Sequence, residues 1–412
     1  MRMVVVPGLL EVAAFSLAIA PFAKYQHELR TWTRDTPALT PIQHHANDTP
    51  CLALVPTWNE GLVIEQKLDN LSQQEGIDHL FLIDSASTDR TVEKALIWLE
   101  AHPTAFNTWN HVVLPQRKGK SFAIQHALDH KILTAWNGLV FMTDADALLN
   151  PGCVQSMKRW FHDPMIGAVG ALPQRMDARP EEIHHRNVWD GLRRQESMID
   201  STPFLEGSAM MWRRELVSAE AIDETSNADD AQIACWIRIK HHRRVITDEH
   251  AQFRDRAPTT LQEQRRQKLR RGQGLQRTLA RFSPMVSPQT HGKYSTVIQR
   301  QRQFHLYAPL LLLSAVVFSV LRWGFIFLSG WPPITTQAGM VHVGMMSGEM
   351  LGLSLWFFGR RGKRTGFFPL LTTWLVSMEL LLISMSRIIR GIPSNMWVQH
   401  TETRMTMVDD EI

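Results

Sequence analysis

Four long apolar segments near the two ends of the chain constrain its fold more than any other feature. They are Val4–Ala23, Leu306–Leu328, Ala338–Phe358 and Phe367–Ile389. Each is close to the roughly 20 residues that a helix needs to cross a bilayer. Buried core helices are the alternative, but the clustering at both ends favours membrane spans. We therefore expect an N-terminal transmembrane anchor at residues 1–25, about three spans within 305–390, and a tail at 391–412.

Every apolar segment contains at least one charged residue. These residues are Glu11, Arg322, Glu349, and Glu379 with Arg387. Ionisable side chains within membrane spans usually face the interior of a helix bundle or reach toward its ends. We expect the same placement here.

The basic residues beside the spans predict the orientation of the chain. The first span lacks a signal-peptide cleavage pattern, so we interpret it as a retained anchor. It is followed by Lys24, His27, Arg30 and Arg34, and residues 360–364 form a second basic segment. By the positive-inside rule, both belong in the cytoplasm. The sequence therefore predicts an integral protein of the cell membrane with a cytoplasmic central region.

Charge and cysteine usage exclude several other classes of protein. The net charge is only +4, and we find no basic-aromatic pattern typical of RNA binding, so nucleic acid is not an expected partner. Cys51, Cys153 and Cys235 have no CxxC spacing, which argues against a zinc site or a disulfide framework. Phosphate groups and an anionic membrane surface are better partners for the excess positive charge. The sequence does not indicate an oligomeric state.

The central region, residues 45–260, alternates short apolar strands with helical stretches. The expected strands are Cys51–Thr57, His79–Asp84, Val112–Leu114 and Leu139–Thr143. This alternation predicts an α/β fold with a mostly parallel sheet and crossover helices. Ligands of such sheets bind beyond the carboxyl ends of the strands, where Asp84, Lys120 and Asp144 fall.

Asp144 and Asp146 directly follow the last of these strands. Residues i and i+2 of an extended chain point to the same face, so both carboxylates can bind one cation. A divalent ion held by carboxylates can also bind a diphosphate and neutralise it as a leaving group. We expect a metal site for Mn²⁺ or Mg²⁺ formed by Asp144 and Asp146.

Six short motifs in a fixed order resemble those of family 2 glycosyltransferases with the GT-A fold. The resemblance is to the membrane-integrated branch that contains cellulose, chitin and hyaluronan synthases and many lipid-linked sugar transferases. It covers about residues 50–280, with spans on both sides. The motifs are Pro56-Thr57-Trp58-Asn59-Glu60, Asp84-Ser85-Ala86-Ser87-Thr88-Asp89, Gly119-Lys120, Asp144-Ala145-Asp146, Asp229-Asp230 and Gln267-Lys268-Leu269-Arg270-Arg271.

The resemblance implies a donor side that binds a nucleotide-diphosphate sugar. Asp84 resembles the aspartate that contacts the base, typically uracil, which favours a UDP-sugar. The other implied donor contacts are Thr57, Glu60, Lys120, Asp144, Gln267 and Arg270. Turn formation, helix capping or solvated surface charge would also explain several of these residues. In the Gln-x-x-Arg-Trp motif of the family, Arg271 occupies the tryptophan position, so processive synthesis is not predicted.

On the acceptor side, the resemblance places the general base second in an acidic pair. That residue is Asp230, which would take the proton of an attacking hydroxyl. Asp229, Gly207 and Ser208 are the expected acceptor-side neighbours. Helix capping alone could also place two acids at a helix start.

Residues 261–304 are dense in arginine and are predicted to form a basic interfacial helix followed by a linker. Taken together, these features predict a membrane-bound, metal-dependent glycosyltransferase that transfers a sugar with inversion to a lipid-linked or saccharide acceptor. One alternative is a synthase that loads a sugar onto polyprenyl phosphate. Another is a scaffold that binds nucleotide sugars without turnover.

Overall fold

The computed structural model describes residues 2–176, 180–256, 260–363 and 368–393. The predicted tail therefore lies largely outside the described residues, as does Arg364 of the second basic segment. The strands are β1 (Cys51–Thr57), β2 (His79–Asp84), β3 (Thr108–Val113), β4 (Leu139–Thr143), β5 (Leu148–Leu149), β6 (Ile166–Met176), β7 (Ala209–Arg213) and β8 (Arg244–Arg256). The helices are α1 (Arg2–Arg34), α2 (Ile64–Ser72), α3 (Thr91–Ala101), α4 (Lys120–Asp129), α5 (Lys131–Ala135), α6 (Cys153–Arg159), α7 (Pro180–Ile199), α8 (Asp229–Lys240), α9 (Leu261–Phe282), α10 (Pro288–His291), α11 (Lys293–Arg302), α12 (Ala308–Ser329), α13 (Gln337–Arg360) and α14 (Pro369–Ile389).

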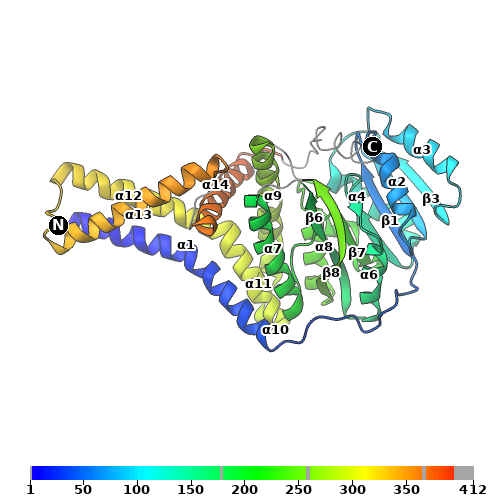
Figure 1. Ribbon diagram of the computed structural model, residues 1–412, viewed down its shortest axis with the longest axis horizontal. Coiled ribbons are helices and arrows are strands. Elements are labelled where there is room, and N and C mark those ends of the chain that lie inside the picture. Colours follow the sequence, from blue (N-terminus) through cyan, green and yellow to red (C-terminus); the bar gives the residue numbers. More distant parts are fainter. Residues whose placement is uncertain (1, 177–179, 257–259, 364–367, 394–412) are drawn as a thin grey trace.

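The strands form one eight-stranded sheet in the order β3-β2-β1-β4-β7-β6-β8-β5 (Figure 1). The first four strands in this order are parallel, which confirms the predicted α/β core. The second half is mixed, because β7 runs antiparallel to both β4 and β6. Three strands agree with their predicted bounds, and β3 begins four residues earlier than Val112. The strands β5, β6, β7 and β8 were not predicted.

The core lies on both faces of the sheet because its strands are apolar on both sides. Cys51, Ala53 and Val55 face a cluster formed with α2, α3 and α6. Leu52 and Leu54 face a second cluster formed with α4, α5 and α8. All seven residues of β1 are buried, as expected for a central strand.

The order of the strands reverses between β1 and β4. From β1 the chain proceeds outward to β2 and β3, and it then returns to add β4 on the other side of β1. The helices α2 and α3 therefore cover one face, while α4 covers the other. In open α/β sheets such a switch point leaves a crevice beyond the carboxyl ends of the strands.

The basic helix predicted within residues 261–304 is α9, and it is packed inside the protein. Leu279 and Phe282 contact α8 and α11 in a third apolar cluster. On another side of the helix, Gly272 approaches α14, where an added Cβ would lie 2.9 Å from Ser384 Oγ. The helix α9 therefore joins the sheet domain to the candidate membrane helices, and it lies between them in Figure 1.

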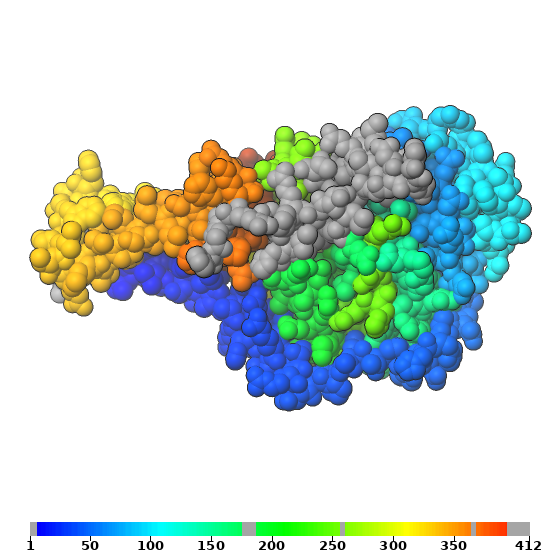
Figure 2. Space-filling model, viewed as in Figure 1, coloured from blue at the N-terminus to red at the C-terminus, as the bar shows by residue number. Residues whose placement is uncertain are grey.

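The helices α1, α12 and α13 extend away from the sheet domain as a narrow arm (Figures 1 and 2). Large apolar side chains are exposed along this arm. They include Leu9, Leu17, Val320, Phe327, Met340 and Leu353. Exposed apolar surface of this extent is typical of contact with lipid.

Within the described residues, three segments are long and apolar enough to cross a membrane. They are Val6–Arg34, Lys293–Ser329 and Pro369–Ile389. The fourth expected span coincides with α13, a helix of 24 residues that is less apolar because it is interrupted by glycines and by His342 and Glu349. The number of spans therefore stays a prediction.

Three charged residues of the predicted spans, Glu11, Arg322 and Glu349, are paired with one another, whereas Glu379 contacts Arg265 of α9. Arg322 of α12 is 1% exposed, and its Nε donates to Glu11 of α1 at 2.9 Å. The same guanidinium also contacts Glu349 of α13, whose other carboxylate oxygen accepts a hydrogen bond from Trp323. A buried arginine with two carboxylate partners fixes the relative rotation of these three helices.

We expect Arg322→Leu to destabilise the helix arm, because Glu11 and Glu349 would lose their shared cation. Removing one partner of a buried ion pair typically costs about 3–5 kcal/mol. Thermal unfolding of the detergent-solubilised protein measures this loss. A triple variant with Glu11→Gln and Glu349→Gln added should recover most of it. A single variant as stable as the wild type would contradict the prediction.

Candidate functional site

A lysine lies between two carboxylates at the switch point of the sheet. Lys120 begins α4, and its Nζ is 2.6 Å from Asp144 Oδ1 and 3.4 Å from Asp229 Oδ2. Ser208 Oγ donates to the other oxygen of Asp144 at 3.1 Å. The structure thus brings together four predicted site residues from four separate segments: Lys120, Asp144, Ser208 and Asp229.

Burial and neighbouring charges have opposite effects on the pKa values of Lys120 and Asp144. Burial alone would lower the pKa of Lys120, but Asp144 and then Asp229 more than offset it and raise the pKa above its ordinary value. Burial raises the pKa of Asp144, while Lys120 acts in the opposite direction. Lys120 therefore stays cationic, but it offsets only part of the effect of burial, and the pKa of Asp144 remains above its ordinary value.

Asp230 lies at the first turn of α8, as predicted. Its Oδ1 accepts a hydrogen bond from the Ala231 N–H at 2.7 Å, and its Oδ2 accepts one from the Gly207 N–H at 3.1 Å. Burial, and next the neighbouring Asp229, raise the pKa of Asp230 to about 6. A carboxylate with this pKa can accept a proton near neutral pH.

Gly207 allows its backbone to approach these charged groups. An added Cβ would lie 3.3 Å from Lys120 Nζ and 3.4 Å from Asp230 Cβ. A larger residue would therefore crowd the Lys120 ammonium and contact Asp230. Gly207 thus lies directly between these two predicted site residues.

A cavity of about 130 Å³ contains most of the predicted residues. Its lining residues are Lys120, Asp144, Glu206, Gly207, Ser208, Asn227, Asp229, Asp230, Asp255, Gln267, Arg270 and Arg271. Arg270 reaches it from α9, opposite the carboxylates of the sheet domain. Within the described residues, its buried Nε has no hydrogen-bond partner. An arginine in this state is suited to binding an anionic ligand.

Three other predicted residues lie farther along the same sheet edge and do not line this cavity. Asp84 ends β2 and is 3% exposed, and its Oδ1 accepts a hydrogen bond from Thr57 Oγ1 at 2.9 Å. Its Oδ2 also accepts from the Ser87 N–H at 2.7 Å, so the carboxylate stabilises the turn after β2. Glu60 is 1% exposed, and its backbone N–H donates to Thr91 Oγ1 at 2.7 Å.

Asp146, the second predicted metal ligand, does not line the cavity either, although it lies in the turn that Asp144 begins. Among the described residues there is no group of three or more acidic, histidine or cysteine side chains placed to hold a metal ion. Two carboxylates are nevertheless a sufficient protein contribution for Mg²⁺-type sites, where phosphate oxygens and water complete the coordination. The donor set therefore fits a metal that is shared with a diphosphate.

Lys67 is a residue of the site region that sequence reasoning missed. It is fully buried under the Asp144–Ala147 turn, and its Nζ donates to Thr143 Oγ1 at 2.7 Å and to the Ala147 carbonyl at 2.5 Å. Burial lowers the pKa of Lys67 to about 7. A single lysine on the buried side of α2 was the only available signal, and it has no motif around it.

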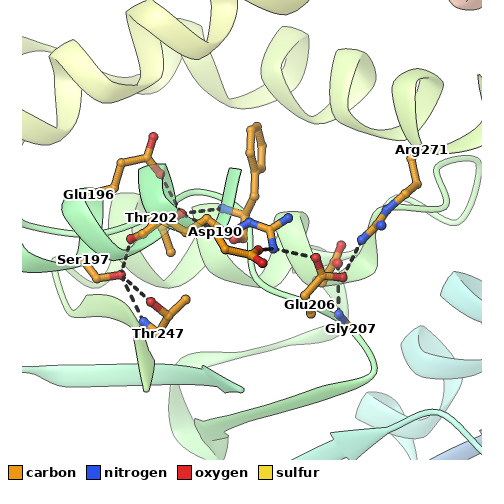
Figure 3. Close-up of polar contacts among 11 residues, drawn as sticks. Asp190, Glu196, Ser197, Thr202, Glu206, Gly207, Thr247 and Arg271 are labelled. Atoms are coloured by element: carbon orange, nitrogen blue, oxygen red, sulfur yellow. Dashed lines mark hydrogen bonds and ion pairs between the residues drawn. The ribbon is translucent and has the colours of Figure 1, made fainter. Parts of the chain in front are cut away.

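The ion pairs that Glu206 forms with two arginines were also not predicted from the sequence. Glu206 is 4% exposed and lies 2.5 Å from Arg193 of α7 and 2.5 Å from Arg271 of α9. Arg271 extends from its helix toward Glu206 in Figure 3. The interaction with Glu206, acting against burial, raises the pKa of Arg271. These partners are distant in sequence, so no local pattern reveals them.

The chain has the GT-A fold of glycosyltransferases, with a mixed sheet and a carboxylate-lined cavity at the switch point of that sheet. The model of glycosyl transferase family 2 matches residues 53–219, and that of glycosyl transferase family group 2 matches residues 139–377. The second match covers more than half of the chain. The chain therefore belongs to the family 2 glycosyltransferases, and it is an enzyme of that class.

Among solved structures, the mannosyltransferase PcManGT from Pyrobaculum calidifontis, in complex with GDP-Man and Mn²⁺, is similar over 93% of this chain and 99% of its own. Its TM-score is 0.71 at 23% sequence identity, which shows a shared fold. Glucosyl-3-phosphoglycerate synthase from Mycobacterium tuberculosis, in complex with Mg²⁺ and UDP, has a TM-score of 0.39 at 19% identity, over 62% of this chain and 83% of that one.

Among curated proteins, an uncharacterized protein of Mycobacterium tuberculosis is 26% identical over 125 residues, which are 30% of this chain. The match spans only 36% of that relative's length.

We expect Lys67→Met to loosen the Asp144–Ala147 turn, because the lysine holds the turn from below with two hydrogen bonds. Mutation of a residue that orients metal ligands typically lowers metal affinity by about 10- to 100-fold. Titration of the protein with a nucleoside diphosphate in the presence of Mn²⁺ measures the loss. Lys94→Met, which removes a partly exposed ion pair with Glu65, is the matched control. Equal affinity in both variants would contradict the role of Lys67.

Proposed function

We propose that this glycosyltransferase is embedded in the membrane and transfers a sugar from a nucleotide-diphosphate donor to a lipid-linked or saccharide acceptor. The observation behind the proposal is one cavity that contains Asp144, Arg270 and Asp230. A diphosphate site and a potential base thus lie side by side at the switch point of the sheet.

The donor diphosphate would lie between the sheet domain and α9. Lys120 and Arg270 supply positive charge from opposite sides, and Gln267 lines the same wall. Asp144 and Asp146 would hold Mn²⁺ or Mg²⁺, which supplies charge neutralisation for the leaving diphosphate. In support, the structurally similar PcManGT was solved with Mn²⁺ and a nucleotide sugar.

The nucleoside would extend from this cavity along the edge of the sheet toward β1 and β2. Thr57, Glu60 and Asp84 lie there, and Asp84 would contact the base. We propose a UDP-sugar as the donor, as the resemblance at Asp84 favours. The donor of PcManGT is GDP-Man, so a panel of donors is needed to identify the base.

Asp230 would take the proton of the acceptor hydroxyl. Hydrogen bonds from Gly207 and Ala231 hold the carboxylate in place, and its pKa of about 6 suits proton uptake at neutral pH. Gly207, Ser208 and Asp229 would border the acceptor. One base and one in-line attack imply inversion at the anomeric carbon.

The sheet domain would face the cytoplasm. The C-terminal part of α1 and the end of α13 both lie at the sheet-domain end of the arm (Figure 1), and both have basic residues there. The positive-inside rule applied to these residues favours this orientation. Lipid acceptors and a cytoplasmic nucleotide sugar could then meet at the membrane surface.

One prediction of the proposed function concerns the carboxylates that would bind the metal. In membranes, Mn²⁺-dependent release of nucleotide from the preferred donor should fall by at least about 100-fold in Asp146→Asn, because diphosphate charge is less neutralised. Glu93→Gln removes only a surface ion pair with Arg90 and serves as the control. Tight donor binding without release in the wild type would favour a non-catalytic scaffold.

Another prediction concerns the pH dependence of transfer. The pKa of Asp230 is raised to about 6, so the base is protonated below that value and ionised above it. Transfer activity, measured as kcat/KM, should therefore rise with pH up to about 6 and then level off. Asp230→Asn should abolish transfer. Retained transfer in this variant would instead favour loading of a polyprenyl phosphate, whose phosphate is already ionised and needs no base.

A further inference from the structure

A buried cluster of ion pairs lies beside the candidate base Asp230. Glu206 is 4% exposed, and its carboxylate contacts Arg193 of α7 and Arg271 of α9, each at 2.5 Å (Figure 3). The two arginines bind different oxygens of this carboxylate. We call Glu206, Arg193 and Arg271 the Glu206 clamp. The clamp holds Glu206 from two helices that are distant in sequence.

Stability alone is a weak reason for such a cluster. Transfer of charged groups out of water carries a large cost, which offsets most of the attraction within a buried ion pair. Apolar residues of similar volume often give equal stability at such positions. The clearer consequence of the clamp is the fixed position of Glu206 and of the backbone attached to it.

Glu206 belongs to the turn that contacts the base. Its carbonyl oxygen accepts a hydrogen bond from the Ala209 N–H at 3.2 Å, which closes a tight turn before β7. The next residue, Gly207, donates its N–H to Asp230 Oδ2 at 3.1 Å. Because two arginines hold the side chain of Glu206, this N–H stays directed at the carboxylate. The clamp thus positions Asp230 through the backbone of the turn.

Arg271 also acts on Asp230 through space. Both side chains line the cavity of about 130 Å³ and an adjoining cavity of about 190 Å³. The charge of Arg271 interacts with Glu206 and with Asp230. Burial and Asp229 raise the pKa of Asp230 most, while Arg271 lowers it and Glu206 raises it. Arg271 is therefore divided between its counter-ion Glu206 and the base.

Other charged groups also surround Asp230. In the smaller cavity they are Lys120 of α4, Asp144 after β4, Asp229 of α8, Asp255 of β8 and Arg270 of α9. On the side of the larger cavity they are Asp190 and Glu196 of α7 and Lys268 of α9. Of the two cations that lower the pKa of Asp230, Arg271 has a larger effect than Lys120. Removal of Arg271 should therefore change the base strongly.

We propose that Glu206 and Arg271 are positioning residues for the base Asp230. Glu206, held by both arginines, keeps the Gly207 N–H on the carboxylate, and Arg271 balances the negative charges of Glu206 and Asp230. Neither side chain has to touch the donor or the reacting atoms. The share of Arg271 that Glu206 takes sets how readily Asp230 accepts the proton of the acceptor. This inference rests on the proposed function and adds two residues to the same site.

The test is the pH dependence of Mn²⁺-dependent nucleotide release from the preferred member of a panel of UDP- and GDP-sugars. It is measured as kcat/KM with the full-length protein in membranes. A base acts in its ionised form, so the acid limb of the profile follows the pKa of Asp230. In Arg271→Gln, Asp230 loses a neighbouring cation, and the limb should move up by about one pH unit. In Glu206→Gln, a neighbouring negative charge is lost and Arg271 is released, so the limb should move down by about one pH unit.

Further variants separate this role from a structural one. The double variant Glu206→Gln with Arg271→Gln removes both charges, so its limb should return toward that of the wild type. Arg271→Lys keeps the cation and should stay close to the wild type. Arg277→Gln, on the same helix but bonded to Thr225, is the matched control. Mn²⁺-dependent binding of a nucleoside diphosphate, measured in each variant, shows that the protein is folded.

Acid limbs that coincide with the wild type in both single variants would overturn the proposal. Limbs that move in the same direction, activity that falls equally at every pH, or loss of nucleotide binding would also overturn it, because a purely structural ion pair has these effects. If the wild type releases no nucleotide from any donor, the proposed function itself is refuted. Normal release with unmoved limbs in the variants would refute this inference alone.

Discussion

The packing of α9 between the sheet domain and the candidate membrane helices is the constraint on which the rest of the structure depends. On one side Leu279 and Phe282 pack against α8, which begins with Asp229 and Asp230. On another side Gly272 allows α14 to approach closely. Because α9 also contains Gln267, Arg270 and Arg271, the helix that packs against the candidate membrane helices also completes the wall of the cavity that contains Asp144 and Asp230.

Positive and negative side chains alternate in the site, which lowers the free-energy cost of burying them. Lys120 separates Asp144 from Asp229, and Arg271 approaches both Glu206 and Asp230. An isolated buried carboxylate would take up a proton, whereas alternating neighbours keep several charges in a small volume. The exception is Arg270, which has no hydrogen-bond partner at its buried Nε within the described residues. Its position marks where a negatively charged substrate group would complete the alternation.

The sequence predicted the parallel half of the fold better than the mixed half, for a physical reason. The strands β1, β2 and β4 are buried on both faces and read as short apolar runs that end in polar turns. In contrast, β7 consists of Ala-Met-Met-Trp-Arg and has no β-branched residue, so local propensity gives little sign of a strand. The order of motifs located Lys120, Asp144, Asp229 and Asp230, which do lie together. Lys67 and the Glu206 ion pairs depend on contacts between distant segments, and no local pattern contains them.

The π-helical turn at Gln303–Tyr307 joins α11 to α12 without a break, so one helical rod runs from the sheet domain into the predicted span. Each residue advances a helix by about 100°, and the wider turn therefore sets the angular phase of everything that follows it. With this phase, Phe304 and His305 line a cavity of about 190 Å³ that also contains Asp230, while Arg322, more than a dozen residues later, faces Glu11. Deletion of one residue from the turn would rotate α12 by about 100° relative to α11, so these two sets of contacts could no longer form together. The π-helical turn thus couples the rotation of α12 about its own axis to the shape of the cavity beside Asp230.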